Sequence, residues 1–234
     1  MAAAIGSSRV GLGAVGRIVA AVLIVGFFLG PIVWILLLSV KPAALALQSP
    51  PVFWFEPTLR EFREVFGERS LYPRFMLNSV IVAGGNTLLS LLLGLPAAYA
   101  FARLRFRLCH DLLVWILSVR IAPPIAVLLP FYLIMREIGL LDRHLALILI
   151  YLTFNLPFLV WIMKGFFEEV PIELEEAARM DGLSTLETFR AVVLPLVRPG
   201  IVITAIFAFI FSWNEFLFAL VLTNQRAQTL PVAM

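Results

Sequence analysis

Charged side chains are scarce in this sequence of 234 residues, because Asp, Glu, Lys and Arg together make up only 14% of it. Hydrophobic residues make up 62%, whereas a typical soluble domain is about 45–50% apolar and about 25% charged. A compact globule of this length cannot bury so much apolar surface, so the excess must face lipid. The composition therefore excludes a soluble enzyme, a small disulfide scaffold and a disordered protein.

Residues that carry catalytic or metal chemistry are equally scarce. Cys109 is the single cysteine, which excludes an internal disulfide and a cysteine-based metal cluster. The sequence contains no G-x-x-x-x-G-K-[S/T] loop, no H-E-x-x-H and no G-x-S-x-G motif. The net charge is +3, without a basic run long enough to follow nucleic acid. We therefore expect no catalytic residue, no metal site, no ATP site and no nucleic-acid partner on this chain.

Long apolar windows are what the sequence has in abundance. A helical span needs about 20 mostly apolar residues, and lipid-exposed backbone must satisfy its own hydrogen bonds, which favours helices. Only two of the windows contain a charged residue, Arg120 in one and Glu215 in another. The sequence thus predicts an all-α membrane protein with five transmembrane helices, at residues 18–40, 75–102, 112–135, 145–163 and 200–225.

The positions of the arginines predict the orientation. Arg9 and Arg17 precede the first window, and Arg103, Arg105 and Arg107 follow the second. Short loops rich in Lys and Arg lie in the cytoplasm, so we expect residues 1–17 to form a cytoplasmic N-terminal segment ahead of one membrane domain, 18–234. The loop 168–199 is then cytoplasmic and the C-terminus is outside.

The loop 168–199 is a polar stretch that predicts ordered structure. Pro171 suits the first turn of a helix, and Gly182 can adopt the left-handed conformation that ends it. Ser184 and Glu187 have the spacing of a capping box, which predicts a second short helix. The sequence therefore predicts a helix–turn–helix between the fourth and fifth spans.

The faces of the first of these helices suggest a role. At 100° per residue, Leu174, Ala177 and Ala178 share one side, whereas Glu175, Glu176 and Arg179 share the other. Two adjacent alanines make a flat surface on which another protein can dock. An amphipathic hairpin that lies on the membrane, or on its own bundle, explains the same pattern.

The spacing of this loop resembles a known family. Residues 176–182 read E-A-A-R-M-D-G, and after nine further residues the chain reads V-V-L-P at 192–195. This resembles the EAA loop of ABC-importer permeases, with Val192 where isoleucine is usual. Residues 78–79, 96–103, 139–142, 212–216 and 229–232 resemble the inner-membrane permease subunit of carbohydrate ABC importers of the MalG type, a binding-protein-dependent transport system inner membrane component.

The resemblance implies the partners and the residues that contact them. Such a permease pairs with a second permease subunit as a heterodimer, binds two ATPase subunits that hold ATP and Mg, and receives a sugar from an extracytoplasmic solute-binding protein at the bacterial or archaeal cytoplasmic (inner) membrane. The residues expected to couple this chain to an ATPase are Glu176, Ala177, Ala178, Asp181, Gly182, Leu194 and Pro195. The family usually has six spans, so the resemblance also implies a last helix beyond Met234, which truncation removes or a partner replaces.

Polar residues inside the spans are the candidates for the translocation path. A charge near the middle of a bilayer usually faces a cavity or a partner. Arg120, Asn155, Asn214 and Glu215 are therefore expected to line the path, although Arg120 and Glu215 could instead pair with each other. The same architecture could carry glycerol phosphate or a polyamine. An ion-coupled secondary transporter is the alternative from another class, and it would need an inverted repeat.

Overall fold

The computed structural model describes residues 12–46, 48–67, 70–104 and 107–234, and in these ranges all regular structure is helical. The chain divides into two units, residues 1–70 and 71–234. Two turns, η1 and η2, are respectively 3₁₀-helical and π-helical. The elements are α1 (Leu12–Ser39), α2 (Ala43–Ala46), α3 (Arg60–Val65), α4 (Tyr72–Arg103), α5 (Cys109–Ser118), η1 (Val119–Ile121), α6 (Pro124–Glu137), α7 (His144–Glu168), α8 (Ile172–Met180), α9 (Thr185–Thr188), η2 (Phe189–Val193), α10 (Leu194–Leu196), α11 (Arg198–Trp213), α12 (Leu217–Leu222) and α13 (Leu230–Ala233).

The first unit contains the long apolar helix α1. Its large side chains from Ile18 to Ile35 are exposed to the surroundings, as expected of a helix that faces lipid. After α1, the Lys41 ammonium group is buried, donates to the Val52 carbonyl oxygen at 2.7 Å and lies against the rings of Trp34 and Phe55. This buried cation fixes the short segment that follows the helix.

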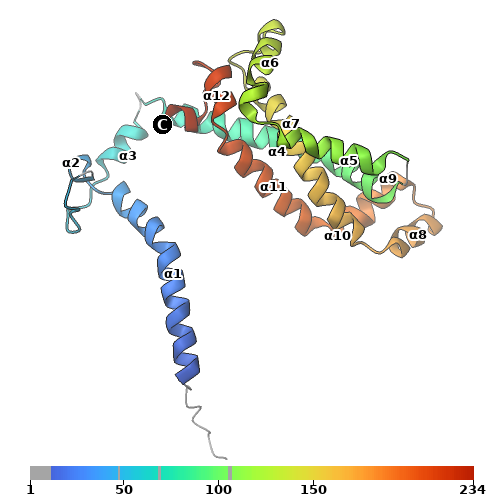
Figure 1. The fold of residues 1–234 in the computed structure, drawn as a ribbon, viewed down its shortest axis with the longest axis horizontal. Coiled ribbons are helices and arrows are strands. Elements are labelled where there is room, and N and C mark those ends of the chain that lie inside the picture. The colour runs from blue at the N-terminus through green and yellow to red at the C-terminus, as the bar shows by residue number, and fades with distance from the viewer. Residues whose placement is uncertain (1–11, 47, 68–69, 105–106) are drawn as a thin grey trace, which may run out of the picture. The chain divides into compact units, whose positions relative to one another are not determined.

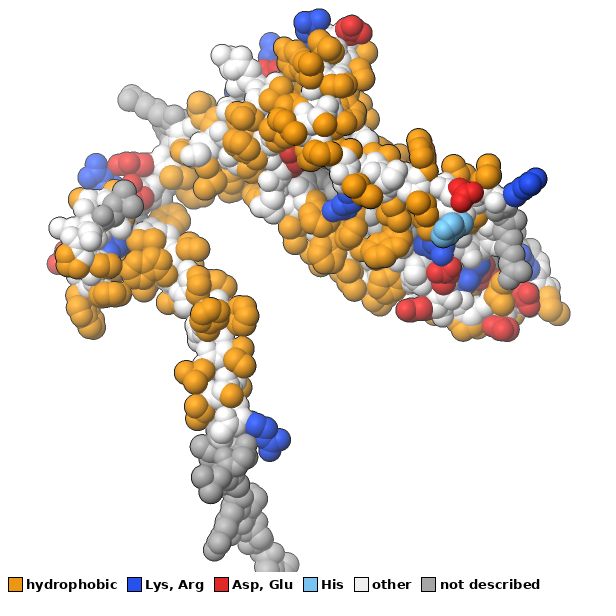
Figure 2. Space-filling view, in the orientation of Figure 1, with side chains coloured by type: hydrophobic (Ala, Val, Ile, Leu, Met, Phe, Trp, Pro, Cys, Tyr) orange, Lys and Arg blue, Asp and Glu red, His pale blue; other side chains and the backbone are white. Residues whose placement is uncertain are grey.

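The second unit is built on three helices, α4, α7 and α11, that pack against one another. Figure 1 shows α8, α9 and α10 at one end of this bundle, and α6 and α12 at the other. Gly94 permits the closest approach, because a Cβ there would lie 2.3 Å from a methyl group of Leu159. In Figure 2 hydrophobic side chains cover the middle of the unit, and charged ones gather at the end that carries α8 and α9.

The continuity of the helices differs from the sequence prediction at two windows. Within the described residues, three helices are long and apolar enough to cross a membrane, and up to five spans result if each bent pair counts as one. Residues 112–135 do not form one helix: α5 with η1 meets α6 at a bend of 93°. Pro123 and Pro124 lie at this bend, and proline neither donates a backbone hydrogen bond nor allows the preceding residue a helical conformation easily.

The window 200–225 is also interrupted. The helix α11 ends at Trp213, and α12 starts only at Leu217. At its other end, α11 meets the segment Thr185–Leu196 at a bend of 79°. The membrane boundaries of these segments stay a prediction. Residues 1–11 of the expected cytoplasmic segment, Arg9 among them, and Arg105 lie outside the described residues.

Candidate functional site

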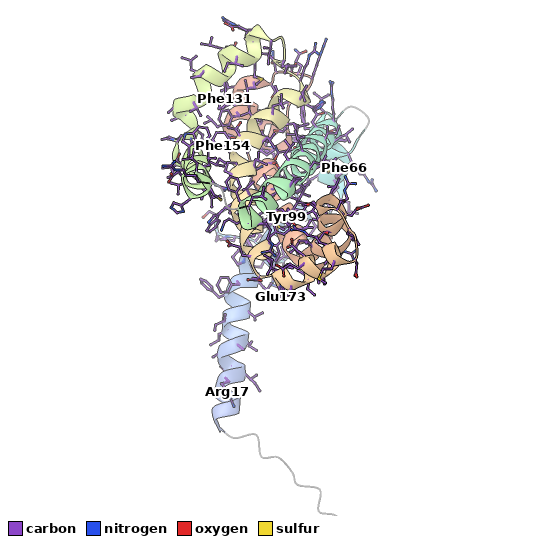
Figure 3. All side chains as sticks on the ribbon, turned by 90° about the vertical axis from the view of Figure 1, so that its right-hand side faces the viewer. Arg17, Phe66, Tyr99, Phe131, Phe154 and Glu173 are labelled. Carbon is purple, nitrogen blue, oxygen red and sulfur yellow. The ribbon has the colours of Figure 1, made fainter. Side chains whose placement is uncertain are left out.

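The loop between α7 and α11 is tied to the end of α4 by a buried carboxylate. Glu175 on α8 is 1% exposed. Its Oε1 accepts a hydrogen bond from Arg103 Nε at 2.6 Å, and its Oε2 accepts one from the Tyr99 hydroxyl at 2.5 Å. Arg103 also donates to the Val170 carbonyl oxygen at 2.6 Å. Figure 3 shows Tyr99 on α4 near the end of the bundle where α8 carries Glu173.

This arrangement corrects the predicted faces of α8. Glu175 was expected on the side opposite Ala178, with Glu176 and Arg179, yet it is buried together with Ala178. The expected pair of Glu175 with Arg179 is present only at 4.0 Å, since Arg103 and Tyr99 hold the carboxylate more closely. Local periodicity could not reveal partners 72 and 76 residues away.

The side of α8 that faces away from the bundle exposes both apolar and charged side chains. Leu174 and Met180 are exposed by 44% and 88%, and Ala177 and Glu176 are exposed beside them. We call Leu174, Ala177 and Met180 the α8 outer face. Exposed apolar side chains interspersed with acidic ones, such as Glu173 and Glu176, are suited to contact another protein.

The turn after α8 has the predicted form. Gly182 has a φ of +91°, a conformation that glycine adopts without strain. Ser184 and Glu187 form the predicted capping box at the start of α9. Asp181 and Gly182 are exposed, whereas Leu194 and Pro195 are partly buried on the following segment. α8, the turn and α9 thus form a helix–turn–helix, whereas its place between the fourth and fifth spans stays a prediction. Five of the seven expected coupling residues, Glu176, Ala177, Asp181, Gly182 and buried Ala178, lie in α8 or its turn.

An open cavity of about 240 Å³ lies at the side of the bundle, and Arg120, Asn155 and Glu215 all line it. The Arg120 guanidinium carbon lies 4.4 Å and 4.8 Å from the ring centroids of Phe158 and Phe211, a cation–π arrangement. Among the described residues, Arg120 and Glu215 form no ion pair. The alternative in which these two charges neutralise each other by direct pairing is therefore wrong in this structure.

The Glu215 carboxylate caps the helix α12 instead. It accepts hydrogen bonds from the backbone N–H groups of Leu217, Phe218 and Ala219 at 3.0–3.3 Å. A negative charge at a helix N-terminus is favourable. Asn214 does not line the cavity with the other three candidates: it is exposed, and its side chain donates to the Ile210 carbonyl oxygen of its own helix.

A buried polar cluster beside the cavity joins the three central helices. The Asn155 amide on α7 donates to Asn86 Oδ1 on α4 at 2.7 Å and to Ser212 Oγ on α11 at 2.9 Å. Asn86 in turn donates to the Ile148 carbonyl oxygen at 2.9 Å. In an apolar environment such bonds satisfy groups that would otherwise lack a partner, so this cluster fixes the register of α4, α7 and α11.

A second carboxylate organises the end of the bundle opposite α8. Asp142 accepts hydrogen bonds from the backbone N–H groups of four consecutive residues, 224–227, at 3.0–3.3 Å. Burial raises the pKa of Asp142, but the four backbone donors outweigh this effect and hold the pKa below its usual value. Asn78 donates to the carbonyl oxygens of Arg226 and Gln228, so the same loop is also tied to α4.

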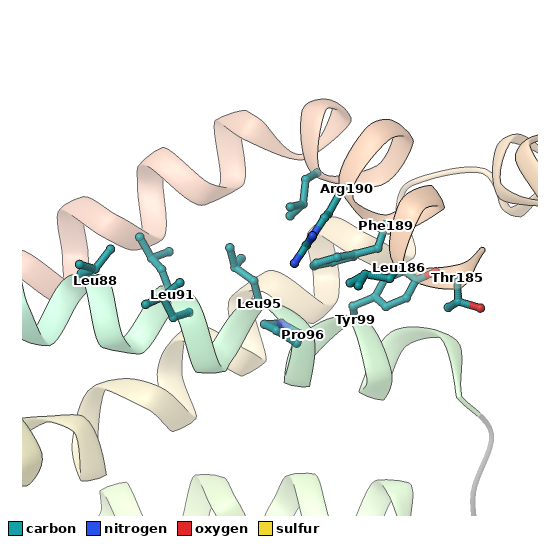
Figure 4. A pocket seen from close by; sticks show the side chains of 11 residues that line it. Leu88, Leu91, Leu95, Pro96, Tyr99, Thr185, Leu186, Phe189 and Arg190 are labelled. Atoms are coloured by element: carbon teal, nitrogen blue, oxygen red, sulfur yellow. The ribbon is translucent and has the colours of Figure 1, made fainter. Parts of the chain in front are cut away.

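A larger cavity, about 500 Å³, lies between α4 and the segment Thr185–Leu194. Figure 4 shows Leu88, Leu91 and Leu95 on one side and Phe189 with Arg190 on the other. Its lining is almost entirely apolar, and its one charged side chain is Arg190. It lacks the set of polar groups that a sugar needs.

The chain matches the family described as "Binding-protein-dependent transport system inner membrane component" over residues 90–233. The chain belongs to this family. It is 39% identical over 213 residues to the trehalose transport system permease protein SugB of Mycobacterium tuberculosis, covering 91% of this chain and 77% of that protein. It is 32% identical over 219 residues to the trehalose/maltose transport system permease protein MalG of Thermococcus litoralis, covering 93% and 78%.

A solved structure has the same fold. The crystal structure of a bacterial ABC transporter involved in the import of the acidic polysaccharide alginate superposes with a TM-score of 0.77 at 25% identity, covering 99% of this chain and 81% of that one. The chain is therefore a multi-pass membrane protein with the fold of an ABC-importer permease, as the sequence predicted.

Sequence reasoning missed several residues that organise this permease. Asn86 and Tyr151 lie in long, mostly apolar stretches, and Asp142 lies in a short loop. An isolated amide or phenol in an apolar window is a usable signal, because a buried polar group needs a partner. The identity of that partner depends on packing between distant helices.

Proposed function

We propose that this chain is a pore-forming subunit of an ATP-driven importer that receives a sugar from an extracytoplasmic binding protein. The observation that carries the proposal is the family match over residues 90–233. The names of two relatives, for trehalose and for trehalose/maltose transport, indicate a disaccharide. The chain contains no P-loop motif, so a partner must bind and hydrolyse the ATP with its Mg.

The proposed assembly is a heterodimer with a second permease subunit, two ATPase subunits and the binding protein. We place the N-terminus and the end that carries α8 in the cytoplasm. Charged side chains gather at that end (Figure 2), and Arg103, Arg179 and Arg190 all lie there. Positive charge is enriched in cytoplasmic loops.

The α8–α9 segment is the proposed coupling element to an ATPase subunit. The α8 outer face offers an exposed apolar surface for the partner, and Glu176 and Asp181 offer charge at its edges. On its buried side, the same helix is bound to α4 by Glu175, which accepts hydrogen bonds from Tyr99 and Arg103. A push on α8 is thereby transmitted to a helix that runs through the bundle.

The proposed path includes the cavity that Arg120, Asn155 and Glu215 line. Asn214 lies in the interrupted segment between α11 and α12, beside the proposed path. Its side chain does not line the cavity, because it donates to the Ile210 carbonyl oxygen of its own helix. Residues 214–216 interrupt the helix between α11 and α12, and Glu215 of this interruption lines the cavity.

The test uses the chain co-expressed with the second permease and the ATPase of the same gene cluster, reconstituted in liposomes with the binding protein. We expect ATP-dependent uptake of trehalose or maltose. Ala177→Arg puts a long charged side chain on the α8 outer face and should abolish uptake while the chain still inserts. The matched control, Glu169→Arg, changes an exposed residue outside α8 and should transport normally.

Each part of the proposal has its own contrary result. Normal uptake by Ala177→Arg would remove α8 from the coupling contact. Uptake driven by an ion gradient, with no ATPase bound, would indicate a secondary transporter instead. Import of glycerol phosphate or a polyamine, but of neither disaccharide, would refute the sugar assignment and leave the architecture intact.

A further inference from the structure

The cavity between α4 and the segment Thr185–Leu194 has a length that fits one leaflet of a bilayer. Its α4 residues run from Leu88, at the middle of the helix Tyr72–Arg103, to Tyr99 near the end of that helix. At 1.5 Å per residue this distance is about 16 Å, or about half of a hydrocarbon core of about 30 Å. A helix that crosses the membrane would run along twice this length, whereas one acyl chain spans a single leaflet.

The wall that α4 contributes is apolar and open to the surroundings. Leu88 and Leu92 are 60% and 62% exposed, and Leu91, Leu95 and Pro96 complete this wall. The helix is long and apolar enough to cross a membrane, and exposed apolar surface of this kind marks a contact with lipid or with another protein. The wall is therefore suited to an acyl chain that lies along the helix.

One cation lies among these apolar side chains. Arg190 lines the cavity, and Figure 4 shows it nearer to Tyr99 than to Leu88. Among the described residues Arg190 forms no ion pair. Glu187, the nearest acidic residue along the chain, is instead held by Ser184. A guanidinium group without a counter-charge is suited to a phosphate group, which it can bind through two parallel hydrogen bonds.

We propose that this cavity holds an anionic phospholipid of the leaflet next to α8, with one acyl chain along the leucines of α4 and the phosphate on Arg190. Basic pockets between membrane helices at the cytoplasmic side bind such head groups. The turn η2, which carries Arg190, is π-helical, and π-helical turns are frequent at functional sites. Phe189 of the same turn packs on Tyr99 at 4.8 Å between ring centroids. The lipid would thus lie beside the tyrosine that binds Glu175.

The site goes beyond the proposed function, because it depends on the membrane and not on the solute. The test places the purified complex of this chain and its partners in nanodiscs of phosphatidylcholine with a trace of phosphatidylglycerol that carries a diazirine in its acyl chain. After illumination, mass spectrometry locates the crosslinked peptides. We expect crosslinks within residues 88–95 and 185–194. Excess unlabelled phosphatidylglycerol should remove them, and excess phosphatidylcholine should not.

Variants of two arginines link the crosslinks to the proposed phosphate contact. With the probe below saturation, Arg190→Gln should lower crosslinking in this cavity about fivefold, as for the loss of one cation near an anionic head group. Arg190→Lys keeps the charge and should retain most of the crosslinking. Arg198→Gln is the matched control, because Arg198 is exposed at the start of α11 and does not line the cavity; it should leave the crosslinks unchanged.

Four results would overturn the proposal. Equal crosslinking by phosphatidylcholine with the same diazirine would identify ordinary boundary lipid. Crosslinks in the chain purified alone, but not in the complex, would show that another subunit covers the cavity. Removal of the crosslinks by soluble glycerol phosphate would identify a site for a free phosphate, and crosslinks unaffected by Arg190→Gln would exclude the phosphate contact. The assay needs neither solute nor ATP, so absence of sugar uptake would refute the proposed function and leave this inference standing.

Discussion

Replacement of Glu175 tests whether the coupling helix is held by a buried carboxylate. Glu175→Gln keeps the size of the side chain but replaces one acceptor oxygen with an NH2 group, which then faces a donor, either the Tyr99 hydroxyl or Arg103 Nε. One bond to a charged group is then lost, at about 1.5–3 kcal/mol, and the other loses its charge assistance. We expect α8 to dock about 2–4 kcal/mol less stably on α4. Glu175→Ala, which leaves Arg103 largely unpaired, should destabilise by about 3–5 kcal/mol.

The effect is measured by hydrogen exchange of the α8 amides and by thermal unfolding of the purified chain in detergent. Tyr99→Phe removes the second donor to the same carboxylate and should give a smaller loss that is not additive with Glu175→Gln. Glu173→Gln is the matched control, because Glu173 is exposed on the same helix; its effect should stay within about 0.5 kcal/mol. Unchanged exchange and an unchanged melting temperature in Glu175→Gln would refute the reasoning.

Three further predictions concern the turn, the polar cluster and the outer loop. Gly182→Ala should destabilise the turn by about 1–2 kcal/mol, because alanine disfavours the left-handed conformation, and should reduce uptake. Gly182→Pro should abolish uptake, because proline fixes φ near −65°. If the two variants transported equally well, the role of the turn would be refuted. Asn86→Ala should lower the thermal stability in detergent by about 1–3 kcal/mol in total, because interhelical bonds in membranes contribute about 0.6–1.7 kcal/mol each, and Thr87→Val on the same helix should not. Asp142, whose pKa lies below its usual value because four backbone donors outweigh burial, should stabilise the loop at residues 224–227 fully above pH about 4 and lose this effect as the pH falls further. Hydrogen exchange of these amides, corrected for its intrinsic pH dependence, checks this, and Asp142→Asn should open the loop at neutral pH.

Local signals in the sequence were sufficient for the parts of the fold that depend on neighbours along the chain. The capping box of Ser184 and Glu187 and the left-handed Gly182 need only residues within one turn. The long apolar helices α4 and α7 follow from composition alone. The family resemblance then gave the fold and the importer class.

Contacts between distant elements could not be predicted in this way. Helical periodicity placed Glu175 on the side opposite Ala178, because the pattern of α8 contains no information about Arg103 or Tyr99. The break in the helix at Glu215 could not be predicted for a similar reason. Mean hydropathy is averaged over the break, and in the sequence the carboxylate that caps α12 is only a single charge in an apolar window. The unpaired state of Arg120 depends on two phenylalanine rings from α7 and α11.

The bend between α5 and α6 has a consequence for how the subunit works. Arg120 lies in the three-residue turn η1, at the corner itself. A change in the angle between α5 and α6 would shift this guanidinium group relative to the Phe158 and Phe211 rings, which belong to α7 and α11. Arg120, Ala122 and Pro124 all line the adjoining cavity, so its volume and polarity would change with the angle of this bend.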